Sequence, residues 1–117
     1  MSAAVTAMPP LKENAAVQEL ISVLRKNNME KQLSDFTELI SHVGTVENQL
    51  KSVLGELSDV RKQLSEIKDH QHPIKTACMK MLNSLQSSVH DAQLKLNQLK
   101  TSIIEGAKNA LTAFKEK

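Results

Sequence analysis

The sequence contains no tryptophan and no tyrosine, and its only aromatic residues are Phe36 and Phe114. Three glycines and three prolines in 117 residues are too few for the many turns of a β sandwich or a doubly wound α/β fold. The most frequent residues include Leu, Ala, Lys, Glu, Gln and Ser, which are typical of long helices. The composition therefore predicts an all-α chain, and the length predicts a single domain.

Cysteine is also nearly absent. Cys78 alone excludes an intrachain disulfide and a Cys-rich zinc site, and one free thiol fits the reducing cytoplasm, where we expect the protein. The net charge of +2 is too small to indicate a nucleic-acid or membrane partner. The N-terminal residues lack a secretory signal, and no stretch approaches the roughly 18 apolar residues of a membrane span.

Motifs for chemistry are missing as well. The sequence has no glycine-rich phosphate loop and no nucleophile elbow, so we expect no enzyme, no cofactor and no small-molecule substrate. His70 and His72 could suggest a metal, but on a helix they point about 200° apart. Only Asp69 lies beside them and no second cysteine exists, so we predict no metal site.

The N-terminal part divides into a tail and a short helix. Residues 1–10 are small and uncharged and end in two prolines, which predicts a flexible tail before a single helical domain at 11–117. Asn14 is a good N-cap for a helix at about 15–27. This helix has one apolar face, formed by Val17, Leu20, Ile21 and Leu24.

Two longer helices are predicted at about 29–69 and 74–115, with a turn at 70–73 because proline disfavours helix at the residue before it. Each carries a row of apolar residues in alternating steps of three and four, which is the pattern of a coiled-coil seam. The first seam consists of Val43, Val46, Leu50, Val53, Leu57, Val60, Leu64 and Ile67. The second consists of Cys78, Leu82, Leu85, Val89, Ala92, Leu96, Leu99 and Ile103.

The two seams are mirror images about the predicted turn, because Val43 lies about as far before it as Ile103 lies after it. Equal lengths on both sides of a helix breaker favour an antiparallel hairpin in which each seam faces the other. Charge supports this pairing, since residues 35–72 carry a net charge of −3 and residues 73–117 carry +4. The short helix would cover the end that holds both phenylalanines.

Additional apolar residues lie beside the seams and widen the apolar face beyond the needs of two helices. They form a predicted partner strip: Leu54, Met79, Met81, Leu94 and Ile104. Soluble monomers rarely expose a large contiguous strip, and most homo-oligomers are two-fold dimers. We therefore expect either a homodimer, in which two hairpins join as a four-helix assembly, or another helical protein on the same strip.

A resemblance points the same way. Residues 13–33 (Glu-Asn-Ala-Ala-Val-Gln-Glu-Leu-Ile-Ser-Val-Leu-Arg-Lys-Asn-Asn-Met-Glu-Lys-Gln-Leu) and the heptads behind them resemble an uncharacterised helical family. This family is carried by gut Firmicutes, often on conjugative mobile elements. The resemblance covers most of the chain, carries no catalytic motif and so implies no site residue. It also implies members that continue past Lys117.

Two functional hypotheses follow. The first is a non-enzymatic protein–protein interaction or oligomerisation module built on the coiled-coil hairpin. The second is a small mobile-element regulator that binds a host protein or nucleic acid through the lysine-rich third helix. Its basic residues are all lysines and do not alternate with aromatic residues, which is typical of a solvated face: Lys75, Lys80, Lys95, Lys100, Lys108, Lys115 and Lys117.

Overall fold

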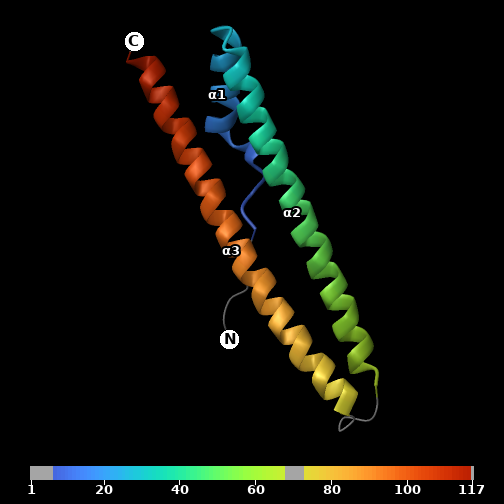
Figure 1. Cartoon of the computed structure of the whole chain (residues 1–117). Coiled ribbons are helices and arrows are strands. Elements are labelled where there is room, and N and C mark those ends of the chain that lie inside the picture. Colours follow the sequence, from blue (N-terminus) through green and yellow to red (C-terminus); the bar gives the residue numbers. More distant parts are fainter. Residues whose placement is uncertain (1–6, 68–72, 117) are drawn as a thin grey trace.

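The computed structural model describes residues 7–67 and 73–116, and all of their regular structure is helical (Figure 1). A 3-10 turn, η1 (Leu11–Glu13), precedes three helices, α1 (Ala15–Lys26), α2 (Glu30–Ser65) and α3 (Pro73–Lys115). No strand occurs within the described ranges. The chain measures 69 × 25 × 16 Å, so the all-α prediction is confirmed for an elongated molecule.

The long helices α2 and α3 lie side by side and run in opposite directions (Figure 1). The short helix α1 packs against both of them where α2 begins and α3 ends. The molecule is therefore three helices thick at this head end and two helices thick at the other end, where α2 ends and α3 begins. We call the second part the loop end.

Asparagines mark both ends of α1. The Asn14 side chain accepts hydrogen bonds from the backbone N–H groups of Ala16 and Val17 at 2.9 and 3.1 Å, which confirms the predicted N-cap. Asn28 adopts a left-handed conformation with φ of 56°, which asparagine tolerates better than most residues. The Met29 N–H then donates to the Leu24 carbonyl at 3.0 Å, so α1 ends in a Schellman turn that leads into α2.

Three differences from the expected boundaries are informative. Helix α2 ends at Ser65 rather than at 69. At Ser65 the side-chain hydroxyl donates to the carbonyl of Lys62, and the chain turns. Residues 70–72 of the predicted turn, with both histidines, lie outside the described residues, and Pro73 begins α3. The flexible tail at 1–10 is wrong for Met8, whose backbone is hydrogen bonded to α3.

The apolar core forms three clusters along the hairpin. At the head end, Leu20 and Leu24 of α1 pack with Ala107 and Leu111 of α3, and both phenylalanines lie against them. In the middle, Leu11 of η1 joins a cluster of Val17, Val43 and Leu96. At the loop end only the two long helices contribute, with Leu57, Leu64 and Leu82 at the centre. The core therefore becomes thinner toward the loop end.

Candidate protein-association surface

Only half of each predicted seam lies between α2 and α3. The residues that are buried or half-buried there recur every seven positions: Val43, Leu50, Leu57 and Leu64 in α2, and Leu82, Val89, Leu96 and Ile103 in α3. Most of the alternate seam residues stay at the surface, with 39–43% of Val46, Val53, Val60 and Ile67 exposed and 46–48% of Leu85 and Leu99. The prediction that the two seams face each other over their whole width is wrong for these six positions.

A buried lysine takes part of the space that these residues leave. Lys100 follows Leu96 by four positions and has none of its surface exposed. Its Nζ lies 3.0 Å from Oε1 of Glu47 in α2 and donates to the carbonyl of Met8 at 2.7 Å. An ammonium group is costly to bury unless it is paired and hydrogen bonded. Lys100 therefore holds α2, α3 and the N-terminal segment together.

A second polar contact lies nearer the loop end. Arg61 follows Leu57 by four positions, and its Nη2 donates to Asn83 Oδ1 at 2.8 Å and to Gln86 Oε1. Residues three and four positions after an interior residue lie 100° apart around a helix, so a two-helix interface cannot take both. Lys100 and Arg61 lie four positions after an interior residue and take the space between the helices. The apolar residues three positions after an interior residue therefore stay outside the α2–α3 interface.

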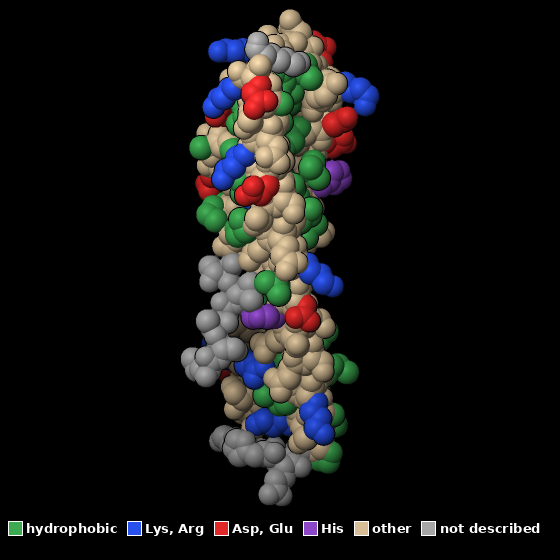
Figure 2. Space-filling view, turned by 90° about the vertical axis from the view of Figure 1, so that its left-hand side faces the viewer, with side chains coloured by type: hydrophobic (Ala, Val, Ile, Leu, Met, Phe, Trp, Pro, Cys, Tyr) green, Lys and Arg blue, Asp and Glu red, His purple; other side chains and the backbone are tan. Residues whose placement is uncertain are grey.

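These outer residues form one apolar surface, which we call the open face. It consists of Leu39, Val46, Val53, Val60 and Ile67 of α2, and of Ile74, Cys78, Met81, Leu85, Ala92 and Leu99 of α3. Cys78 and Ala92 are half-buried, and the others are exposed. Hydrophobic side chains also line the right-hand edge of the lower half in Figure 2, the side that faces the reader in Figure 1.

Both rows point to the same side of the hairpin because they have the same offset from the interior. Val46 follows the interior residue Val43 by three positions, and Leu85 follows Leu82 by three. Two antiparallel helices are related by a two-fold axis perpendicular to the plane that contains them. Rotation about this axis does not exchange the two sides of that plane, so residues at the same offset from the interior row lie on the same side of the hairpin. Helix α1 and η1 contact the opposite side, through residues such as Ile40 and Ile104, and leave the open face uncovered.

The open face is most apolar toward the loop end. Ile74 and Met81, at that end of α3, are the most exposed large hydrophobic residues described, at 66% and 65%. Toward the head end, the positions that continue the row of α3 are Gly106 and Ala113, and Leu39 alone continues the row of α2. The surface is therefore asymmetric along its length.

The predicted partner strip does not form one surface. Met81 lies on the open face, and Leu54 and Leu94 are 45% exposed but project from other sides of their helices. Met79 packs instead against the loop-end cluster, and Ile104 packs against the cluster of Leu11 and Val17. Met79 and Ile104 thus belong to the core, because α3 is rotated relative to the predicted seam.

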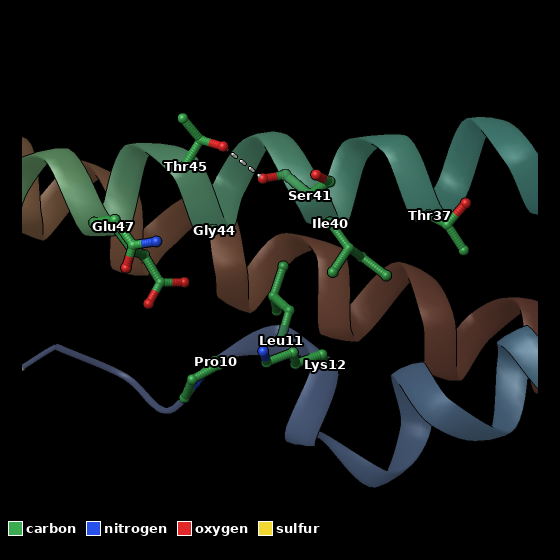
Figure 3. A pocket seen from close by; sticks show the side chains of 10 residues that line it. Pro10, Leu11, Lys12, Thr37, Ile40, Ser41, Gly44, Thr45 and Glu47 are labelled. Atoms are coloured by element: carbon green, nitrogen blue, oxygen red, sulfur yellow. Dashed lines mark hydrogen bonds between the residues drawn. The ribbon is translucent and has the colours of Figure 1, made fainter.

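A groove of about 480 Å³ lies between η1 and α2 (Figure 3). Several of its polar groups already have partners, since the Thr37 and Thr45 hydroxyls donate to carbonyls of α2 and Glu47 pairs with Lys100. Leu11 points from η1 toward the long helices and closes one side of the groove (Figure 3). The groove thus lies at the contact between the N-terminal segment and α2, and its polar groups take part in that packing.

The lysines of α3 do not form a continuous basic stripe. Lys100 is buried, and Nζ of Lys75 donates to the carbonyl of Ile67 at 2.9 Å. Across residues 7–67 and 73–116, no group of three or more His, Cys, Asp and Glu side chains comes together as a metal site would require. None of the helices in this part of the chain is both long and apolar enough to cross a membrane.

Residues 13–117 match DUF6674, a family of unknown function. The chain belongs to this family. The match includes all three helices of the DUF6674 fold, from the N-cap of α1 to the end of α3. No curated protein and no solved structure matches the chain.

The apolar heptads in the sequence do not reveal the polar residues inside the DUF6674 hairpin. Gln86, Gln93 and Lys100 follow each other at intervals of seven, and Glu47 and Arg61 lie two such intervals apart on α2. Gln93 is buried, and its Nε2 donates to Asn97 Oδ1 at 3.0 Å. Polar residues at intervals of seven beside an apolar row are a signal in the sequence that indicates an interior with both polar and apolar contacts.

Proposed function

We propose that this DUF6674 chain is a non-enzymatic protein–protein association module, and that two hairpins join through their open faces in a four-helix assembly. One observation carries the proposal. Each long helix presents a second row of apolar residues at intervals of seven, and both rows lie on the side of the hairpin that α1 does not cover.

The physical reason is that these residues gain from burial and have no cover within the hairpin. A large contiguous apolar surface on a soluble monomer marks an interaction site more often than a solvated face. A second hairpin would supply matching rows with the same heptad spacing. Each long helix would then bury three positions per heptad, as the helices of a bundle do.

The other hypothesis, a mobile-element regulator that binds nucleic acid through α3, gains no support from the contacts of its lysines. Phosphate binding needs several accessible cations on one surface. Two of the six lysines in α3 have their Nζ engaged within the chain, at Lys75 and Lys100. A mobile-element context is a prediction from the resemblance alone.

Sedimentation equilibrium of a charge variant tests the proposal. In Val60→Glu with Leu85→Glu, each copy would bring two carboxylates into the apolar contact, and burying an unpaired charge is costly. We expect the unaltered chain to form dimers, and we expect the variant to dissociate at least about 100-fold more readily.

A matched control carries the same change in charge elsewhere. Ser58→Glu with Ser87→Glu alters exposed residues of the same two helices outside the open face, and it should leave dimerisation unchanged within about twofold. A chain that stays monomeric at all concentrations contradicts the proposal. So does a dimer that the open-face variant leaves intact.

A further inference from the structure

Resting on the proposed function, we propose that the second copy lies with its loop end beside the loop end of the first. In this arrangement, α2 of each hairpin packs against α3 of the other.

Two-fold symmetry allows two ways of placing open face against open face. If the axis runs along the hairpins, both loop ends lie at the same end and α2 meets the partner's α3. If the axis runs across the hairpins, the loop end of one copy meets the head end of the other, and each helix meets its own counterpart. The two arrangements bury the same face, so the distribution of residues along it decides between them.

The asymmetry of the open face favours the first arrangement. Ile74 and Met81 extend the apolar surface at the loop end, where Val60 and Ile67 of α2 are also exposed. With the loop ends together, these residues meet the equivalent residues of the partner. In the reversed arrangement, they would meet the head end, where the rows continue through Gly106 and Ala113. The first arrangement therefore removes more apolar surface from water.

The charges of the two helices agree with this choice. Over the span of the open face, residues 39–67 hold four acidic and three basic residues, whereas residues 74–99 hold three lysines and one acidic residue. Packing α2 against the partner's α3 brings opposite net charges together at both contacts. The reversed arrangement would place α2 beside α2 and α3 beside α3, so that like charges repel. A hairpin with one acidic and one basic helix is thus complementary to its own copy.

The chain's single cysteine provides the measurement. With loop ends together, the two Cys78 residues lie in one layer of the bundle, and spin labels on them should be within roughly 25 Å, given helix axes 8–10 Å apart. In the reversed arrangement, the two rows of α3 cross near Ala92, so the labels would be roughly 40 Å apart at 1.5 Å per residue. Electron spin resonance of the labelled dimer of residues 1–117 distinguishes these distances.

Because Cys78 lies on the open face, a second label position keeps the test independent of contacts there. Thr76 is exposed and lies two positions before Cys78, about 200° around the helix, so Thr76→Cys in a Cys78→Ser chain places the label outside the contact. The expected distance is below roughly 35 Å with loop ends together and above roughly 45 Å when reversed. A control chain that also carries Val60→Glu and Leu85→Glu should lose the intermolecular signal at both label positions, whichever arrangement the dimer adopts.

The outcomes separate this inference from the proposed function. Short distances at both label positions support the arrangement with loop ends together. A dimer that depends on Val60 and Leu85 but shows long distances at both positions overturns the arrangement and leaves the proposed function standing. A chain without an intermolecular signal at any concentration overturns both.

Discussion

Among single residues, Lys100 connects three parts of the chain in the middle of the molecule. Its ammonium group lies between a carboxylate of α2 and the backbone of Met8, far from either in sequence. The same segment is held a second time, because the Met8 N–H donates to Asn97 Oδ1 at 3.2 Å. The ammonium group of Lys100 thus fixes the backbone at Met8 against α3.

Replacing this cation tests its role. Lys100→Met keeps the length of the side chain but leaves Glu47, whose side chain is only 17% exposed, without its partner. We expect the free energy of unfolding to fall by about 3 kcal/mol in urea denaturation. Adding Glu47→Met removes the unpaired carboxylate and should restore part of this loss.

Lys95→Met is the matched control, because Lys95 is an exposed lysine of the same helix, and it should change stability by less than about 0.5 kcal/mol. Equal losses in the single and double variants would show that Glu47 gains nothing from Lys100.

For the helical elements, much could be predicted from the sequence, because the signals are local. Asn14 caps the start of α1 with its side chain, Asn28 ends α1 in a left-handed backbone conformation, and Pro73 begins α3. The lengths of the long helices follow from their heptads. What periodicity could not predict is how far each helix is rotated about its axis.

The rotation depends on contacts between residues far apart in the chain. Val46 and Glu47 are neighbours, and a pattern of apolar residues assigns the interior to Val46. In the folded chain Glu47 lies inside, because Lys100 meets it from α3, and Val46 is left at the surface. The seam residues are therefore correct as apolar positions, but they divide between an interior row and the open face.

This division predicts that truncating Leu57 and truncating Val60, three positions apart in α2, have different effects on the free energy of unfolding. Leu57 lies in the interior row and is 8% exposed, whereas Val60 lies on the open face. At concentrations where the chain is monomeric, Leu57→Ala should lower the free energy of unfolding by about 2–4 kcal/mol. Val60→Ala should lower it by less than about 1 kcal/mol. Similar losses at both positions in thermal or urea unfolding would mean that Val60 is interior.

The two ends of the molecule bury unequal amounts of apolar core. At the head end, α1 adds Val17, Leu20 and Leu24 to the core, and all three are buried. At the loop end, the two sides of the hairpin are connected by one cluster, by the contacts of Arg61 and by the hydrogen bond from Lys75 to Ile67. Regions with fewer buried apolar contacts open locally at lower free energy than the rest of a protein.

Amide hydrogen exchange should reveal this difference. We expect amides near Leu64 and Leu82 to open with a free energy at least about 1 kcal/mol below that of amides near Leu20 and Leu111. If hairpins associate through the open face, protection near Leu64 and Leu82 should rise with protein concentration while the head end changes little. Uniform protection along the hairpin in the dilute chain would contradict the inequality.

The contacts of the N-terminal residues also have a consequence for synthesis. Met8 is bound by a residue 92 positions later, and Leu20 and Leu24 are covered by Ala107 and Leu111. On the ribosome, Met8 and α1 therefore emerge well before the residues of α3 that bury them. Until α3 is complete, the apolar residues of α1 and α2 that pack on α3 stay exposed to chaperones and to other nascent chains. A chain that terminates within the second half of α3 would release a product whose helix α1 keeps its contacts with α2 but lacks those with Ala107 and Leu111.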